Sequence, residues 1–284
     1  MITFFSIPKK FNSEFSLIQE NAILSWLAIN NSQVFLLGDE EGVDVFAAKY
    51  GIEHIKNIPV NSSDTPLLSE AFRIVKSKSV HDIIIYVNCD IIFTASLLNT
   101  VNFISSRFQK YVIVGRRSDV DISKKIDFSD INWETNLLSE YSESLELHSA
   151  SGIDYFIFPK SIEINMPQFA VGRPSWDNWM IYYFLKMNYS VFDSTKINLV
   201  LHQNHKRGYA IYGEESKSNF YLAGGTINLC DISHSNFKLL KANNHYQINM
   251  NYIGIFKYFL PIRFLFSLRL DLINFYLEKI RRVK

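Results

Sequence analysis

The segment Asp82-Ile-Ile-Ile-Tyr-Val-Asn-Cys-Asp90 decides the fold class of this chain. It predicts a buried strand that ends abruptly on Asn88, Cys89 and Asp90. An apolar run of this length is typical of a parallel strand covered on both faces. Ligands of open α/β sheets bind just beyond the carboxyl ends of such strands, where Asp90 is well placed to hold a divalent cation. Asn and Asp also end strands as ordinary turn residues, and this second interpretation stays open.

Strand and helix patterns alternate on both sides of this segment. Strands are predicted at 2–7, 34–37, 52–58, 82–90, 111–115, 153–158, 191–193 and 199–202, and helices at 12–30, 43–50, 65–77, 96–108 and 177–187, with a largely helical insertion at 128–148. Pro66 is expected at the first position of its helix, which suits proline. The alternation predicts right-handed crossovers and a mainly parallel central sheet. We expect one Rossmann-type α/β domain over 1–245 and a tail of amphipathic helices over 246–284.

The overall composition limits the class of protein. The chain has 284 residues, of which 48% are hydrophobic and 15% aromatic, so it is a folded globular protein rather than a disordered one. A net charge of +1 gives no case for a nucleic-acid partner. Cys89 and Cys230 form neither a disulfide framework nor a zinc spacing, and no secretory signal is evident. These features favour a cytoplasmic protein.

The charge is unevenly distributed along the chain. From Tyr252 onward seven basic residues face two acidic ones, a net charge of +5 against −4 for the rest. Basic residues interleaved with Phe, Leu and Tyr favour interfacial helices on an anionic membrane surface. The tail is therefore expected to hold the protein peripherally on the inner face of the cell membrane. Packing of the tail on the domain, or on a second subunit in a homo-oligomer, is the alternative.

Carboxylates also occur near two other predicted strands. Asp39 and Glu40 lie in a glycine-flanked turn after strand 34–37, where a carboxylate can accept hydrogen bonds from a ribose. The spacing is not that of the dinucleotide-binding fingerprint, and a solvated acidic turn is the alternative. Asp154 stands beside a glycine at a strand start, and it can hold sugar hydroxyls or form a turn.

The segment 169–179 places Asp177 between two tryptophans at a predicted helix start, with Ser175 as the cap. Aromatic surroundings raise the pKa of a carboxyl group toward the range of a general base. The ring of Trp176 can also stack on a sugar. The alternative is a capping acid between two core aromatic residues.

Two histidines, His202 and His205, follow the predicted strand 199–202. Imidazole can complete a Mn²⁺ site that a carboxylate has begun, although the His-x-x-His spacing is weakly specific by itself. Arginine side chains match phosphate oxygens, so basic loop residues are candidates for neutralising a diphosphate, or are simply solvated. These residues are Arg116, Arg117, Lys206 and Arg207.

Taken together, these segments resemble predicted bacterial glycosyltransferases of the GT-A, or nucleotide-diphospho-sugar transferase, fold. The matching segments are 5–10, 37–43, 65–68, 86–92, 114–122, 152–159, 169–179 and 202–205. The resemblance spans roughly residues 3 to 235 and does not cover the tail.

The resemblance implies a site and a reaction. In GT-A enzymes a DxD motif holds the metal and the donor diphosphate, and here Asn88-Cys89-Asp90 takes its place, with a neutral first residue. Asp90, with His202 or His205, would bind Mn²⁺ or Mg²⁺, and Asp177 would be the base of an inverting transfer. The implied nucleotide-sugar site comprises Ile7, Pro8, Asp39, Glu40, Asn88, Arg116, Arg117, Asp154 and Trp176.

The implied activity is transfer of a sugar from a nucleotide-diphosphate donor to a glycan or glycolipid hydroxyl, in capsule or lipopolysaccharide synthesis. Two alternatives remain open. One is a sugar nucleotidyltransferase, although Pro8-Lys9-Lys10 is a poor match to the glycine-rich loop of such enzymes. The other is a non-catalytic glycan-binding or scaffold protein with a degenerate metal site, which only Asn88 supports.

Overall fold

The computed structural model describes residues 2–11, 15–205 and 213–259. Within these residues the main sheet contains β1 (Ile2–Ser6), β2 (Ser32–Leu37), β3 (Glu53–Ile55), β4 (Ile83–Val87), β6 (Tyr111–Val114), β9 (Tyr155–Pro159), β10 (Ser190–Asp193), β12 (Phe237–Ala242) and β13 (His245–Met250). Their order is β13-β12-β10-β6-β9-β4-β1-β2-β3. The predicted helix cap near residue 12, the basic residues Lys206 and Arg207, and the tail from 260 onward lie outside the described ranges.

The sheet is mainly parallel. The pairs β1–β2, β1–β4, β2–β3, β6–β10 and β10–β12 are parallel. Strand β9 runs antiparallel to β4 and β6, and β12 and β13 form an antiparallel hairpin. The predicted α/β domain with a mainly parallel central sheet is confirmed. The hairpin carries the sheet to Met250, beyond the expected domain end at residue 245.

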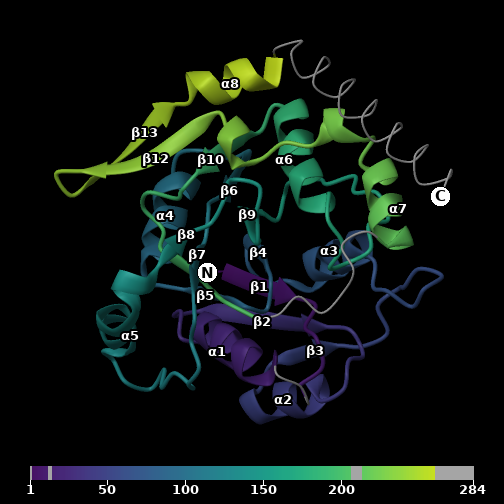
Figure 1. Ribbon diagram of the computed structural model, residues 1–284, viewed down its shortest axis with the longest axis vertical. Coiled ribbons are helices and arrows are strands. Elements are labelled where there is room, and N and C mark those ends of the chain that lie inside the picture. Colours follow the sequence, from purple (N-terminus) through teal and green to yellow (C-terminus); the bar gives the residue numbers. More distant parts are fainter. Residues whose placement is uncertain (1, 12–14, 206–212, 260–284) are drawn as a thin grey trace, which may run out of the picture.

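Helices cover both faces of this sheet (Figure 1). One face packs on α1 (Phe15–Leu27), α2 (Val43–Tyr50) and α4 (Ser96–Ser105), and the other on α3 (Leu68–Lys78) and α6 (Trp176–Lys186). Adjacent strand residues point to opposite faces. Phe4 of β1 stacks on Trp26 of α1 at 5.8 Å between ring centroids, whereas Phe5 meets Phe72 of α3 at 4.9 Å. Apolar residues therefore fill every position of β1, as in other strands buried on both faces.

A second sheet stands beyond the carboxyl end of β4. It contains β5 (Ile91–Phe93), β7 (Ser118–Val120), β8 (Glu146–Leu147) and β11 (Val200–Gln203), in the order β5-β11-β7-β8. Strand β5 begins directly after Asp90, and His202 of β11 lies opposite both Ile91 and Asp119. The sequence patterns identified neither β7 nor β8. This small sheet sets the histidine of β11 beside the end of β4.

The start of α3 differs from the prediction. Pro66 is not its first residue, because the helix begins at Leu68. Pro66 instead forms a β-bridge with Val60, and Leu67 forms one with Ala170. These bridges require extended backbone at both residues, so the helix cannot begin earlier.

The remaining helices lie toward the edges of the molecule in Figure 1. They are α5 (Trp133–Tyr141), which confirms a helix in the 128–148 insertion, α7 (Glu214–Leu222) and α8 (Tyr252–Phe259). Short 3-10 turns occur at Ser142–Ser144, Thr226–Asn228 and Ile232–His234. Among the described residues, no helix is both long and apolar enough to cross a membrane.

Candidate functional site

Three candidate metal ligands meet beyond the end of β4. Asp90 follows this strand, His202 lies on β11, and His205 stands just after β11. The Nε2 atoms of His205 and His202 lie 3.1 Å and 3.6 Å from Asp90 Oδ2. One ligand atom from each residue lies within 4.8 Å of the other two. The structure thus brings together the three residues that the sequence predicted as metal ligands.

The chemistry of this cluster suits a divalent cation. Burial opposes the ionisation of Asp90, but the nearby imidazoles of His202 and His205 outweigh it and hold the pKa of Asp90 below its usual range. Asp90 Oδ1 is buried without a hydrogen-bond partner in the described part of the chain. An anionic carboxylate with a spare oxygen beside two imidazoles is a donor set that Mn²⁺ accepts. The residues present therefore fit a metal.

A buried ionic network adjoins the cluster. The Arg117 side chain is 12% exposed, and its Nη1 donates to Asp154 Oδ2 at 2.6 Å. Its Nε donates to Asp119 Oδ1 at 2.8 Å, so one guanidinium joins two carboxylates. Asp119 also lies 2.9 Å from His202, between Oδ1 and Nδ1, and 2.6 Å from His148, between Oδ2 and Nδ1. Arg117 was predicted to face a diphosphate, and here its contacts are with these two protein acids.

Asn88 is tied to Asp154 in this structure. Asn88 Nδ2 donates to Asp154 Oδ1 at 2.9 Å, and the hydroxyl of Tyr86 donates to Asn88 Oδ1 at 3.1 Å. A carboxylate at position 88 would stand against that of Asp154, and two adjacent like charges are unfavourable. The neutral amide can donate to Asp154, which a carboxylate at this position could not do.

Asp177 lies in the first turn of α6. Burial raises the pKa of Asp177 to about 7, against backbone hydrogen bonding that lowers it, and the negative charge of Asp154 adds to the rise. Asp177 Oδ1 is buried with no hydrogen-bond partner in the described ranges. Ser175 stands at the N-cap with a φ of 88°, and its side chain makes no capping hydrogen bond. A carboxyl group of this kind exchanges a proton near neutral pH.

The hydroxyl of Tyr86 shows that Asp177 and the metal cluster share one region. Burial raises the pKa of Tyr86 well above its usual value, and nearby titratable groups raise it further. These groups belong to Cys89, Asp90, Asp154 and Asp177. The hydroxyl of Tyr86 donates to Asn88, and its ring lies 5.0 Å from that of Trp176, the residue before Asp177, so the candidate base lies near the candidate metal ligands.

Trp176 is a core residue. It is 5% exposed, and its ring centroid lies 5.0 Å from that of Tyr86 and 5.7 Å from that of Phe156. Its ring therefore anchors the start of α6 rather than offering an open face to a sugar.

Four predicted nucleotide-binding residues follow the ends of parallel strands. Ile7 and Pro8 come after β1, and Asp39 and Glu40 come after β2, both of which run parallel to the rest of this region of the sheet. Their positions therefore lie at the same sheet edge as the metal-ligand cluster. Asp39 and Glu40 are exposed, and Asp39 Oδ2 accepts a hydrogen bond from the backbone amide of Asn57 at 2.8 Å.

The side chain of Arg116 makes hydrogen bonds to the backbone of the second sheet near β8. Its Nε donates to the carbonyl oxygen of His148 at 2.5 Å, and its Nη2 donates to that of Leu147 at 3.4 Å. Its backbone amide donates to Thr195 Oγ1 at 2.9 Å. The structure therefore sets this predicted diphosphate ligand against the backbone at β8.

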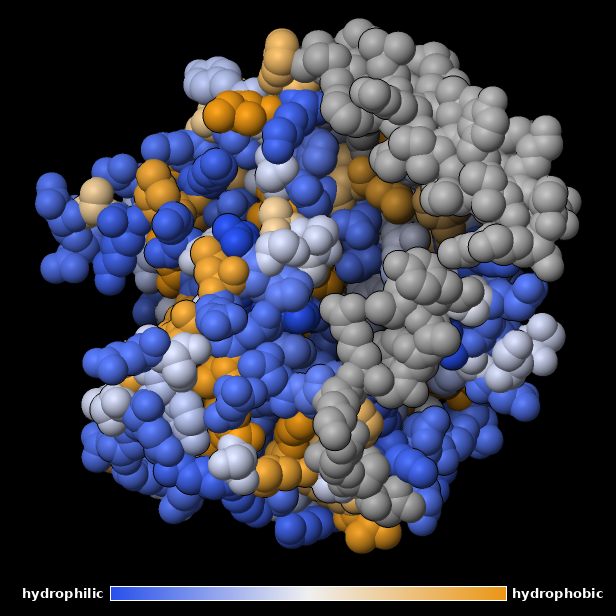
Figure 2. Space-filling view, viewed as in Figure 1, coloured by the Kyte–Doolittle hydropathy of each residue, from blue (hydrophilic) through white to orange (hydrophobic). Residues whose placement is uncertain are grey.

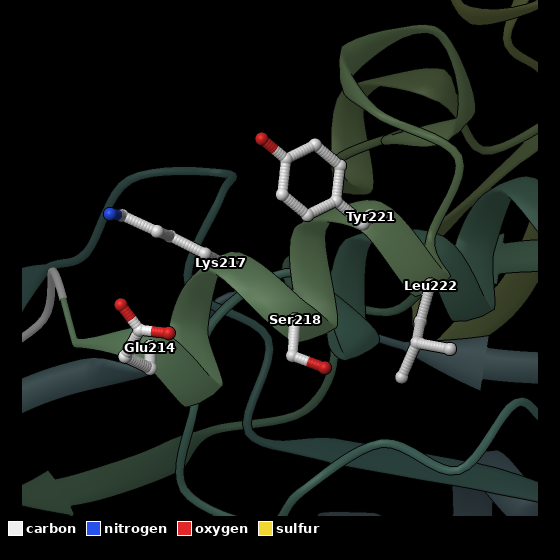
Figure 3. Close-up of a pocket in the computed structure, with 5 residues that line it drawn as sticks. All are labelled: Glu214, Lys217, Ser218, Tyr221 and Leu222. Carbon is white, nitrogen blue, oxygen red and sulfur yellow. The ribbon is translucent and has the colours of Figure 1, made fainter. Parts of the chain in front are cut away.

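A surface hollow of about 480 Å³ lies on α7 (Figure 3). Its lining residues are Glu214, Lys217, Ser218, Tyr221 and Leu222. All belong to one helix, and none belongs to the cluster around Asp90. The hollow is therefore not part of the candidate site.

No protein-family model matches the sequence, and no curated protein matches it. Two solved structures share its architecture at a TM-score of 0.51. The structure of S. aureus TarS 1–349 in complex with UDP-GlcNAc is 13% identical, and the match covers 81% of this chain and 67% of that one. The structure of GalNAc-T7 with UDP, GalNAc and Mn²⁺ is 10% identical, and the match covers 79% of this chain and 48% of that one. The topology and these likenesses together show that the chain has the GT-A fold of nucleotide-diphospho-sugar transferases.

Proposed function

We propose that this protein is a metal-assisted glycosyltransferase that moves a sugar from a nucleotide-diphosphate donor to a glycan or glycolipid hydroxyl. The cluster of Asp90, His202 and His205, with a carboxylate oxygen that has no hydrogen-bond partner among the described residues, carries this proposal. The similar structures hold UDP-GlcNAc in one case and UDP, GalNAc and Mn²⁺ in the other, which supports the same ligand class here. The expected biological role is the synthesis of a surface polysaccharide such as capsule or lipopolysaccharide.

Each part of the site has a role in this reaction. Asp90, His202 and His205 would hold Mn²⁺ or Mg²⁺, which when bound neutralises charge on the departing diphosphate. Asp39 and the nearby backbone contact the nucleoside. Asp177 takes the proton of the acceptor hydroxyl while that oxygen bonds to the anomeric carbon and the bond to the diphosphate breaks. Direct displacement of this kind inverts the anomeric configuration.

Two alternatives give different results in the same assays. A sugar nucleotidyltransferase would join a nucleoside triphosphate to a sugar phosphate and would not transfer the sugar. A scaffold protein with a lost metal site was suggested by Asn88 alone. Asn88 donates a hydrogen bond to Asp154, and this structural role explains the amide without a lost metal site.

Thermal unfolding with a panel of nucleoside diphosphates and nucleotide sugars, with and without Mn²⁺, tests the proposal. We expect the melting temperature to rise with one nucleoside diphosphate and to rise further with Mn²⁺, since a ligand at one hundred times its Kd stabilises a protein by about 2.7 kcal/mol. Asp90→Asn is expected to lose the part of the rise in melting temperature that depends on Mn²⁺. The exposed Asp121→Asn serves as the control and should keep it. Absence of any shift in folded protein would contradict the proposal.

We also propose that α8 binds the surface of an anionic membrane. Four large hydrophobic side chains of this helix are 63–75% exposed: Tyr252, Ile253, Phe256 and Phe259. Figure 2 shows hydrophobic residues, with hydrophilic ones beside them, at the top of the view where α8 lies. Lys257 adds a positive charge, and such a combination is typical of interfacial helices.

Vesicle flotation tests this role. The double substitution Ile253→Ser with Phe256→Ser is expected to lower the fraction bound to phosphatidylglycerol vesicles several-fold, because less apolar area enters the interface. The control is Tyr221→Ser with Leu222→Ser on α7, where the side chains are 73% and 41% exposed. Equal flotation of both double variants and the wild type would show that α8 does not anchor the protein.

A further inference from the structure

The two ring nitrogens of His202 face different carboxylates. Nε2 lies 3.6 Å from Asp90 Oδ2, on the side of the candidate metal. Nδ1 lies 2.9 Å from Asp119 Oδ1, close enough for a charge interaction, although it makes no hydrogen bond within the described residues. The strand register produces this arrangement, because His202 on β11 is paired directly with Asp119 on β7.

The negative charge of Asp119 favours one tautomer of the imidazole. A neutral histidine carries one N–H group and one free lone pair. The negative charge of Asp119, 2.9 Å away, favours the proton on Nδ1, and this leaves the lone pair of Nε2 for a cation held beside Asp90. Partners of this kind fix the orientation of a metal-binding histidine and raise its basicity.

Asp119 is itself held from two further directions. Arg117 Nε donates to Oδ1 at 2.8 Å, and His148 Nδ1 lies 2.6 Å from Oδ2. Arg117 in turn reaches Asp154 at 2.6 Å, which links Asp119 to the end of β4 through Asn88. The carboxylate of Asp119 therefore has little freedom to rotate away from His202.

We propose that Asp119 is a positioning residue of the metal site, which acts on the metal through His202 and is held in place by Arg117 and His148. The inference rests on the metal site proposed above and extends it to a residue on a different strand. Asp119 would then be a second carboxylate that supports the metal site. Asn88, the residue before Cys89, carries a neutral amide and provides no such charge.

Titration of the full-length protein with MnCl₂, followed by the electron paramagnetic resonance signal of free Mn²⁺, tests this inference. Asp119→Asn preserves the shape of the side chain and removes its charge, and we expect about 10- to 100-fold weaker Mn²⁺ binding. Glu146→Gln is the matched control, because Glu146 is an exposed acid that pairs with Asp119 on the neighbouring strand. This control should bind Mn²⁺ like the wild type.

A double-mutant cycle separates positioning from a general structural effect. If Asp119 acts through His202, Asp119→Asn should weaken Mn²⁺ binding in the wild type and cause no further loss in a His202→Ala background. A His148→Asn variant, which frees one side of Asp119, should give a smaller loss of the same kind. Circular dichroism confirms that each variant is folded.

Two results would overturn the inference, and they differ from each other. If wild type and Asp119→Asn bind Mn²⁺ equally, or if the loss is the same with and without His202, Asp119 has no positioning role and the proposed metal site stands. If the wild type itself binds no Mn²⁺, the metal site fails together with the inference. The nucleotide-dependent shift in melting temperature then still reports on donor binding.

Discussion

Asp177→Asn is expected to lower the turnover number by about 10²- to 10⁴-fold, the contribution of a positioned general base. The donor KM should change little, because the substitution leaves the metal ligands in place. The matched control is Glu70→Gln, an acid in the first turn of α3, which should retain full activity. Steady-state kinetics with the donor identified by thermal shift provides the measurement, and near-wild-type turnover of Asp177→Asn would exclude this residue as the base.

The raised pKa of Asp177 predicts how activity depends on pH. The base must be deprotonated to accept a proton, so turnover of the wild type should rise with pH through about 7. The rise should be absent from the residual activity of Asp177→Asn.

The same pKa has an opposite effect on stability. The folded protein holds the Asp177 proton up to about pH 7, whereas an unfolded chain releases it near the usual aspartate pKa of 3.8. The free energy of unfolding should therefore fall as pH rises across this interval. Asp177→Asn should lack this fall and should be more stable than the wild type at pH 8. Urea unfolding of both proteins at pH 5 and pH 8 measures the difference.

Patterns that depend on neighbouring residues in the sequence predicted much of the fold. The apolar run of β4 and its polar end at Asp90 are of this kind, because burial on both faces requires apolar residues at every position. The first turn of α6 with Asp177 is another example. The GT-A resemblance then predicted that His202 and His205 would meet Asp90, which strand patterns alone do not show.

Features that depend on strand register escaped prediction. Asp119 lies on a three-residue strand, too short for an alternating pattern, and its importance follows from its pairing with His202. Arg117 shows the same limit, since the sequence identified a cation but not the two carboxylates that surround it. Trp176 could equally have faced a sugar or the core, and packing against Tyr86 and Phe156 decided for the core.

Arg117→Met is expected to lower the free energy of unfolding by about 3–5 kcal/mol, the usual cost of removing one partner from a buried ion pair. Its guanidinium joins Asp119 and Asp154, whose side chains are 20% and 9% exposed. Methionine fills similar space but leaves both carboxylates without their cation. Arg73→Met is the matched control, because the Arg73 side chain is 66% exposed where it pairs with Glu70, and surface pairs contribute about 0–1 kcal/mol.

The source of this loss can be identified by pH and by a second substitution. Arg117 helps to hold the pKa of Asp119 below its usual value, against the effect of burial. The ionised carboxylate therefore stabilises the fold at neutral pH. This contribution disappears as the pH falls through the lowered pKa of Asp119. The deficit of Arg117→Met should accordingly shrink between pH 7 and pH 4, as the uncompensated Asp119 takes up a proton. Adding Asp154→Asn to Arg117→Met should recover part of the stability at pH 7, because one buried charge is removed. Guanidinium chloride is unsuitable here because it screens charge, so urea unfolding is the measurement. A loss no larger than that of Arg73→Met, or no recovery in the double variant, would mean that the two carboxylates do not depend on this arginine.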